Sequence, residues 1–480
     1  MNQRALLGRY EVCIIPLSVS EHYPCLRLET TGCRSPKATR NTRNVNGIRE
    51  HVTKQKQEEK VRIGQPNLVV GLTGPFGSGC GEMRKVLEVL GFHPFKISDD
   101  IREELKGKRK LLEKGKLNWR KVLQDHGNEM RKGNGNQDYW IRKVVARIDG
   151  EGIGDGKIVI DGFRNFQEVQ EIRKVYPHFF LVAVCAQKNE RWQRVKDDYE
   201  GRYNEFERDD RRDRSEDFTW GQSVQKCVDD SDYVYYNNEN FLVYPQGKEE
   251  PNLDKIERTL KNQADDFVSL MQGIKNHRCP HPEEVQMAAA YAQSNSSKCI
   301  KRHVGAVITI TQDSREFPIS MGFNENPPHV STCSELQVCC KDENMTAKLK
   351  ARGKNIHCPS CGTRHTDLSE PWTCNECGEN LKECLYPSRN MELCTAIHAE
   401  ERAILSLGGR PVNGGRLYAT TFPCFQCARL ILNAGIKKVV YVEAYPMKET
   451  TEFLEKNGIE VVPFTGFTAR AFFRVFKKVN

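Results

Sequence analysis

The sequence has no run of apolar residues that approaches the roughly 18 needed for a membrane-spanning helix. Its apolar stretch near the start, LLGRYEVCIIPLSV, is short and carries Arg9 and Glu11, so it does not fit the core of a secretion signal. Internal repeats and low-complexity segments are also lacking, which excludes repeat and fibrous architectures. These absences predict a cytoplasmic globular protein without a membrane partner.

Most of the chain has nearly equal numbers of positively and negatively charged residues. Residues 1–62 hold 12 Lys and Arg against 6 acidic residues, so this segment alone supplies +6 of the formal net charge of +9. The remainder is nearly neutral, and charge alone therefore does not indicate that the folded part binds nucleic acid. We predict that residues 1–62 form a poorly ordered basic tail, either a solvated extension or an arm for nucleic acid.

Short apolar runs alternate with amphipathic segments from residue 67 onward. The runs at 67–72, 157–163 and 179–186 have the character of buried strands, and each precedes a stretch with helical spacing. Such alternation predicts a parallel sheet covered on both faces. A second alternating series starts near His281, and an irregular insertion from about 324 to 389 interrupts it. The predicted parts are the tail at 1–62, a first α/β domain at 63–245, a linker and helix at 246–276, and a second α/β domain at 277–480.

What the sequence has in plenty is cysteine, with 19 residues. A reducing compartment argues against disulfides, and the close pairs indicate metal binding. Cys424 and Cys427 follow Pro423 at the predicted start of a helix, where the helix dipole favours thiolates. His398, within a helix predicted over 395–409, supplies a third ligand, which leaves one position of a zinc ion open for water.

Glu400 lies two residues beyond His398, so it flanks the metal instead of binding it. A carboxylate beside metal-bound water can take its proton and then deliver protons to a ring nitrogen and to departing ammonia. The order H-x-E…P-C-x-x-C is typical of zinc-dependent deaminases of nucleobases. The alternative is a structural zinc with a bystander glutamate, and Cys394 is the candidate for its fourth ligand.

A second metal motif stands in the insertion, at about 355–380. Cys358, Cys361, Cys374 and Cys377 form two C-x2-C pairs that are 12 residues apart, with Gly362 and Gly378 after the pairs. Four sulfurs without a spare position predict a closed, structural zinc ribbon, which stiffens a lid or meets another chain. The nearby Cys333, Cys339, Cys340 and Cys384 are either buried small side chains or part of a further metal site.

The stretch GLTGPFGSGCGEM, from Gly71, has the glycine spacing of a phosphate-binding P-loop but lacks its lysine. Cys80 stands in the lysine position, and Gly81 replaces the hydroxyl residue that holds magnesium. Backbone amides can still face a phosphate, so we predict binding of a nucleotide without phosphoryl transfer. The residues predicted to bind it are Gly74, Gly77, Ser78, Gly79, Cys80 and Gly81.

Residues from about 277 to 462 resemble the deoxycytidylate deaminase branch of the cytidine deaminase superfamily. MAAAYAQSNSSKCIKRHVGAVI is similar to that family's first helix and strand, and MGFNENP is similar to its turn. The resemblance implies substrate contacts at Asn324, Ala399 and Tyr445. The simpler alternatives are a left-handed turn at Asn324 and a packed aromatic ring at Tyr445.

LQDHGNEMRK, IVIDGFRNFQEV and RDDRRDR resemble segments of P-loop nucleotide kinases. In that resemblance Asp161 faces a metal, and Arg208, Arg211, Arg212 and Arg214 reach over phosphates. The alternative is a solvated face in which Asp209, Asp210 and Asp213 pair with those arginines.

A P-loop half followed by this deaminase half is similar to the bacterial anti-phage dCTP/dCMP deaminases. The resemblance implies an α/β protein with an N-terminal kinase-like sheet and a C-terminal cytidine-deaminase-like α/β/α domain that carries the zinc ribbon. It also implies catalytic zinc, deoxycytidine nucleotides as substrates and a regulatory nucleotide at the P-loop. Partners expected from it are further copies of the chain and a regulatory RNA or protein. The alternatives are a deaminase of RNA or single-stranded DNA and a non-catalytic nucleotide sensor.

Overall fold

The computed structural model describes residues 66–106, 119–132, 136–216, 219–237, 253–274, 278–344, 356–358, 361–366, 373–377, 381, 394–443 and 446–476. The predicted tail, the beginning of the predicted linker and helix at 246–276, Tyr445 and Cys384 lie outside these residues. Residues 63–480 belong to one compact unit, in which two large sheets are distinguished. The fold is mixed α/β, as predicted, and the proposed domain boundaries stay a prediction.

The first sheet has six strands in the order β13-β5-β4-β1-β3-β2. Five of them pair in parallel, and the short β13 is antiparallel to β5. The predicted buried runs at 67–72, 157–163 and 179–186 are three of these strands. The bounds are β1 Leu68–Thr73, β2 Phe92–Lys96, β3 Lys157–Phe163, β4 Phe179–Cys185, β5 Tyr233–Tyr236 and β13 Gly466–Phe467.

Helices cover both faces of this sheet because its strands are apolar on both sides. Leu68, Val70 and Leu72 pack in one core with α2 (Cys80–Val89), α11 (Leu253–Met271) and α19 (Ala469–Val475). The intervening Val69 packs in a second core on the opposite side. That core is made with α3 (Ile97–Glu104), α5 (Trp119–Arg131), α6 (Tyr139–Glu151) and α7 (Phe166–Val175). Three further helices are α8 (Lys188–Val195), α9 (Tyr203–Arg214) and α10 (Val224–Asp229).

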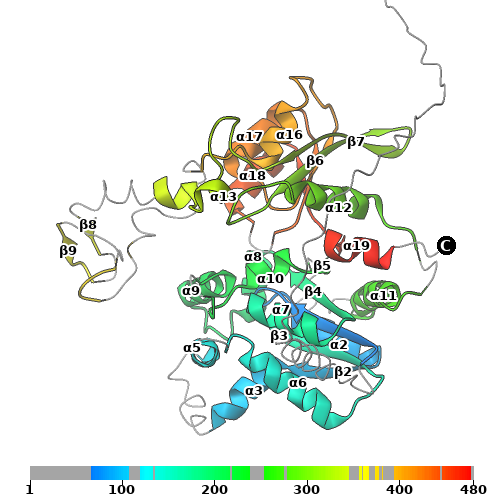
Figure 1. Ribbon diagram of the computed structural model, residues 1–480, viewed down its shortest axis with the longest axis vertical. Helices are drawn as coiled ribbons and strands as arrows, with labels where there is room; N and C mark the ends of the chain where they lie inside the picture. The colour runs from blue at the N-terminus through cyan, green and yellow to red at the C-terminus, as the bar shows by residue number, and fades with distance from the viewer. Residues whose placement is uncertain are drawn as a thin grey trace, which may run out of the picture. The chain divides into compact units, whose positions relative to one another are not determined.

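The second sheet has five strands in the order β12-β11-β10-β6-β7. They are β6 Gly305–Gln312, β7 Arg315–Phe323, β10 Arg416–Ala419, β11 Lys438–Tyr441 and β12 Glu460–Pro463. One face packs against α16 (Ala399–Leu405), α17 (Phe425–Asn433) and α18 (Lys448–Lys456), which lie together in orange in Figure 1. The opposite face packs against α12 (Pro282–Ser294). This is the predicted α/β/α layering.

Residues from both sheets share one hydrophobic core. Ala183 and Val234 of the first sheet lie in the same cluster as Val307 and Val440 of the second. The chain also returns to the first sheet after completing the second, since β13 pairs with β5. The Thr468 hydroxyl then donates to the Ser231 carbonyl at 2.5 Å. This late strand was not predicted, because its two residues carry no periodicity.

Within the cysteine-rich insertion, the described residues form short elements. They are α13 (Cys333–Leu336) and the antiparallel pair of β8 (Ile356–His357) and β9 (Arg364–His365). Across the described parts of the chain, no helix combines the length and apolarity needed to cross a bilayer.

Candidate metal-binding catalytic site

Three metal-ligand side chains gather at the beginnings of two helices. His398 is the N-cap residue of α16, Cys424 is the N-cap residue of α17, and Cys427 lies in the first turn of α17. The helix predicted over 395–409 therefore begins at Ala399, and His398 precedes it. Pro423 likewise lies just before the N-cap, outside the helix. All three ligands thus lie at helix starts, where backbone N–H groups carry partial positive charge that favours anionic sulfur at the two cysteines.

The spacing of these three groups suits one small cation. His398 Nδ1 lies 3.3 Å from the Sγ atoms of both Cys424 and Cys427. In tetrahedral zinc coordination, bonds of about 2.0 Å to nitrogen and 2.3 Å to sulfur put these atoms roughly 3.6 Å apart. All three ligand atoms lie within 4.8 Å of one another. A zinc ion would fit among them after shifts of a few tenths of an ångström.

Gly322 of β7 lets α16 approach the sheet closely enough to form this site. A Cβ atom at position 322 would lie 2.3 Å from the Ala399 carbonyl oxygen and 2.6 Å from the Ala403 nitrogen. Real Cβ atoms do not approach backbone that closely, so any other residue would displace the first turn of α16. The positions of His398 and Glu400 therefore depend on residue 322 of the neighbouring strand β7 being glycine.

Glu400 is buried in the first turn of α16, with 3% of its surface exposed. Burial raises the pKa of its carboxyl, and the neighbouring His398 opposes that shift. A carboxyl group with a raised pKa can both accept and release protons closer to neutral pH. The structure thus places a buried carboxyl group beside the three-ligand group, and its role as a proton carrier stays a prediction.

The three ligands share protons with one another. A hydrogen bond from Cys427 and the neighbouring His398 lower the pKa of Cys424 to about 4, against the effect of burial. Burial would lower the pKa of His398, but its hydrogen bond with Cys424 and the Glu400 charge raise it to about 9. The pKa of Cys427 is raised, first because it donates to Cys424. A bound cation would take the place of these shared protons.

Cys394 does not serve as a fourth ligand in this arrangement. It lies before α16, and its Sγ is 3.9 Å from that of Cys340 instead. The Cys340 backbone N–H in turn donates to Cys333 Sγ at 3.4 Å. Cys333, Cys339 and Cys340 are buried. Among the described residues, this group contains three metal-ligand side chains and not four. Three protein ligands are typical of a catalytic zinc ion, which keeps one coordination position open for water.

The predicted substrate residues have different surroundings. Asn324 is buried, its Oδ1 accepts from Val304 N at 2.7 Å, and its Nδ2 donates to the Arg302 carbonyl at 2.9 Å. It is not among the described residues with left-handed backbone, so that alternative is wrong. Ala399 packs its methyl group into the core, which leaves its backbone for contacts. Substrate contact by these residues stays a prediction, and Tyr445 lies outside the described residues.

A cavity of about 690 Å³ opens beside the ends of β6 and β10. Thr420 and Thr421, just before Cys424, form part of its wall. Arg302, also in the wall, forms an ion pair with Glu443 at 2.8 Å. Burial disfavours the charged form of Arg302, but the carboxylates of Glu443, Asp229 and, to a smaller extent, Glu400 raise its pKa. Arg302 therefore lies within electrostatic reach of the proposed proton carrier.

Both halves of the chain contribute to the wall of this cavity. Lys226 of α10 and Arg470 of α19 line it together with Lys301 and Arg302, against the carboxylates of Asp229 and Asp230. The sequence reasoning missed these residues. They come from three separate segments of the chain, at 226–230, 301–302 and 470, and no local motif marks them.

The four insertion cysteines also come together. Cys358 Sγ lies 3.6 Å from Cys377 Sγ, and Cys361 Sγ lies 3.5 Å from Cys374 Sγ. All four are free thiols within 4.8 Å of one another. In tetrahedral zinc–sulfur coordination the sulfurs are roughly 3.8 Å apart, so a closed four-sulfur zinc site fits. Hydrogen bonds from Thr363 lower the pKa of Cys361 to about 6, which favours the thiolate.

We expect a Cys361→Ser variant to bind one zinc ion fewer per chain than the unmodified protein. The three remaining sulfurs would hold zinc much more weakly, because a structural site needs four ligands. The measurement is zinc content by inductively coupled plasma mass spectrometry after dialysis. The matched control is Cys279→Ser, which removes an exposed thiol outside both groups and should leave the zinc content unchanged. Equal zinc in both variants would contradict the second site.

The glycine-rich turn between β1 and α2 has backbone angles that favour glycine at three positions. Gly74, Gly77 and Gly79 have φ angles of 155°, 73° and 104°, and Gly79 is the N-cap residue of α2. Burial raises the pKa of the Cys80 thiol to about 12, so this side chain is neutral. It supplies no charge where a P-loop lysine would. The nearby Arg194 donates to the Gly77 carbonyl at 3.1 Å and thereby braces the turn.

The three aspartates of α9 are buried, whereas its two glutamates are partly exposed. Asp210 pairs with the buried Arg191 at 2.5 Å, and Asp209 accepts from Tyr199 at 2.9 Å. Asp213 pairs with Arg164. The alternative in which these aspartates form a solvated face with Arg208, Arg211, Arg212 and Arg214 is therefore wrong, because all three aspartates are buried. Asp161 lies in β3 with its carboxylate 3.7 Å from Arg84 Nε.

Two helix starts that present three ligands, with a buried glutamate beside them, define a metal-binding hydrolytic site of the nucleobase deaminase class. Comparison with known proteins agrees with this class. The sequence profile described as "Cytidine and deoxycytidylate deaminase zinc-binding region" matches residues 280–443. The deoxycytidylate deaminase of Enterobacteria phage T2 is 30% identical over 187 residues, which cover 36% of this chain and 86% of the phage protein. Through this part, the chain belongs to the deoxycytidylate deaminase family.

Two further comparisons cover similar lengths. The deoxycytidylate deaminase of Saccharomyces cerevisiae is 30% identical over 181 residues, which are 37% of this chain. The match spans 43% of that yeast protein, less than half of its length. The crystal structure of dCMP deaminase from cyanophage S-TIM5 in complex with dCMP and dUMP aligns over 39% of this chain and all of that chain, with 21% identity and a TM-score of 0.24.

Proposed function

We propose that this protein hydrolytically deaminates deoxycytidine nucleotides to deoxyuridine nucleotides. The observation that carries the proposal is the three-ligand group of His398, Cys424 and Cys427 with Glu400 buried beside it. Relatives named deoxycytidylate deaminase support the nucleotide as substrate. A zinc ion held by the three ligands would make bound water acidic enough to react near neutral pH.

The proton transfers fall to Glu400. Its carboxylate accepts a proton from the attacking water and passes it to the ring nitrogen next to the amino-bearing carbon. It then takes the second proton from the hydroxyl group that was added to the ring carbon and transfers it to the amino group, which departs as ammonia as the carbon–nitrogen bond breaks and the carbonyl forms. The sum is one water consumed and one ammonia released for each uracil formed. The raised pKa of Glu400 suits a group that must both take and give protons.

The phosphates of the substrate would bind in the cavity beside the site. Lys301 and Arg302 line it from the segment before β6, and Lys226 of α10 and Arg470 of α19 line it from helices beside the first sheet. A volume of about 690 Å³ has room for a nucleotide with more than one phosphate. We therefore propose dCTP as well as dCMP as substrates, in antiviral defence by depletion of a DNA precursor, in the cytoplasm. A nucleotide at the turn from Gly74 to Gly81 would regulate this activity, and further copies of the chain would assemble with it.

The test is a substrate panel with the purified zinc-loaded protein. dCMP, dCTP, CTP and a cytosine-containing single-stranded oligonucleotide are incubated separately, and uracil products are followed by chromatography. We expect conversion of dCMP, dCTP or both, and little conversion of the oligonucleotide. Conversion of the oligonucleotide alone would contradict the proposal and favour a polynucleotide deaminase. A protein that binds zinc but converts nothing would favour a nucleotide sensor.

A further inference from the structure

The cavity of about 690 Å³ that we assign to the substrate is closed by the first half of the chain as well as by the deaminase half. Thr420 and Thr421 line it close to the metal ligands, since they lie just before Cys424. Lys226 of α10 and Arg470 of α19 line it from helices beside the first sheet. A substrate in this cavity would therefore contact side chains from both halves.

Helix α10 is held against the deaminase half by its apolar side. Val224 and Val228 lie in the same hydrophobic cluster as Met287 and Ala290 of α12. Lys226, between those two valines in the sequence, is exposed on another side of the helix and lines the cavity. The backbone of Lys226 is therefore fixed relative to the deaminase half by the packing of its own helix.

Other charged groups in the wall already have partners. Three of its cations form ion pairs with carboxylates, in the pairs Arg302–Glu443, Arg470–Asp230 and Lys301–Asp342. The remaining carboxylate of the wall, that of Asp229, accepts a hydrogen bond from Gln225 at 2.8 Å, and its charge raises the pKa of Arg302. Lys226 forms no ion pair with any residue that the structure describes. Its ammonium group is therefore available to an anionic ligand.

Arg302 belongs to the part of the cavity next to the metal site. Its partner Glu443 is buried and also accepts from the Thr421 hydroxyl at 3.1 Å. Thr421 lies three residues before Cys424, and the charge of Glu400 helps to raise the pKa of Arg302. Among the described residues, Lys226 has no such link to the metal site. The two cations thus differ in how closely they are connected to the proposed chemistry.

We propose that Lys226 selects dCTP over dCMP by binding a phosphate beyond the first. This inference rests on the proposed function, because it concerns the same substrate cavity. With the base beside Glu400, the first phosphate would lie near Arg302, and the second and third phosphates would extend toward α10. A triphosphate alone gains the contact with Lys226, whose ammonium group attracts phosphate as a point charge. The first half of the chain would thereby form part of the substrate site itself.

The first test measures selectivity in the zinc-loaded full-length protein, as kcat/KM for dCTP divided by kcat/KM for dCMP. Lys226→Ala should lower this ratio about tenfold, the cost of a hydrogen bond to a charged group. The loss should lie in KM for dCTP and not in kcat, because the contact is away from the reacting carbon. Lys226→Arg keeps the charge and should keep the ratio within about threefold. The matched control is Lys456→Ala, at an exposed lysine of α18 outside the cavity, with less than about a twofold change.

The second test measures binding without turnover, in the full-length protein with Glu400→Gln. Unlabelled dCTP displaces radiolabelled dCMP, so that only competition at the site of dCMP is recorded. Adding Lys226→Ala should raise the dCTP concentration for half displacement about tenfold, whereas adding Lys456→Ala should not. An unchanged selectivity and displacement in the Lys226→Ala protein, or an equal loss for dCMP and dCTP, would overturn the proposal. If the unmodified protein converted neither nucleotide, the proposed function would fail, and the displacement would still decide whether Lys226 binds the triphosphate.

Discussion

Replacing Glu400 by glutamine is expected to reduce deamination at least about a thousandfold, within the range for loss of a general acid–base. The amide keeps the shape of the side chain but cannot take the proton from water. Because Glu400 lies outside the three-ligand group, the variant should keep its catalytic zinc. The measurement combines the rate of uracil formation from dCMP with zinc content by mass spectrometry.

The matched control for this experiment is Glu401→Gln. Glu401 is the next residue of α16 but is only half-buried and outside the ligand group. Its removal should change the rate less than about threefold, as expected for a charge away from the chemistry. If the Glu400 variant kept more than a tenth of the activity, Glu400 would not be the proton carrier. Loss of zinc together with activity would instead make it a structural residue.

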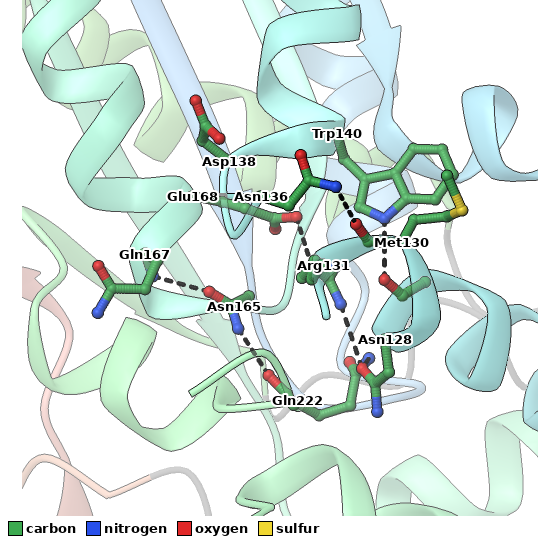
Figure 2. A network of polar contacts seen from close by, with 12 residues as sticks. Asn128, Met130, Arg131, Asn136, Asp138, Trp140, Asn165, Gln167, Glu168 and Gln222 are labelled. Atoms are coloured by element: carbon green, nitrogen blue, oxygen red, sulfur yellow. Dashed lines mark hydrogen bonds and ion pairs between the residues drawn. The ribbon is translucent and has the colours of Figure 1, made fainter. Parts of the chain in front are cut away.

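The second large effect is expected on stability, from Glu168→Gln in α7. Glu168 and Arg131 form an ion pair at 2.7 Å, with 0% and 2% of their side chains exposed (Figure 2). Burial raises the pKa of Glu168, whereas Arg131 favours its charged form. Removing the carboxylate leaves the guanidinium buried without its counter-charge, which costs about 3–5 kcal/mol. Urea denaturation followed by circular dichroism should show a clearly lower midpoint for the first half of the chain.

Two companion variants make this result interpretable. Glu171→Gln on the same helix breaks an exposed pair with Lys174 and should cost less than about 1 kcal/mol. The double variant Arg131→Met with Glu168→Leu removes both charges and should recover most of the lost stability. If Glu168→Gln were no more destabilising than Glu171→Gln, the pair would contribute little, and the network of Figure 2 would be weaker than its geometry indicates.

The strands and helices were largely predictable because apolar periodicity determines which faces are buried. The runs at β1, β3 and β4 are apolar on both sides, and the helix from Leu253 carries its apolar residues on one side. The metal ligands were predictable for a different reason. The ligands lie in two short segments of the chain, one with His398 and one with Cys424 and Cys427. Two cysteines three residues apart are a recognisable metal-binding pattern in the second segment.

Features that depend on distant segments were not predictable. The start of α16 was misplaced because the sequence before His398 has no helix-breaking residue, yet Glu325 and Ile397 pair as a bridge there. The inward direction of Asp209, Asp210 and Asp213 follows from Arg191, Tyr199 and Arg164, which lie elsewhere in the chain. A cavity lined by Gln124 brings together five separate segments of the chain, at Phe76, α3, α5, the end of β3 and Gln222. Local sequence patterns contain no information about such contacts between segments that are distant in the sequence.

The pairing of β13 with β5 has a consequence for how the protein is made. The edge strand Tyr233–Tyr236 receives its outer neighbour only when residues 466–467 have been synthesised, some 230 residues later. At translation rates of about 5–20 residues per second, more than ten seconds pass between the synthesis of β5 and that of β13. During this time the outer backbone groups of β5 have no strand partner. A nascent chain halted before residue 466 would therefore expose the unpaired edge of β5, to which a strand of another chain could pair. Chaperone binding would be needed to prevent such pairing until β13 is synthesised.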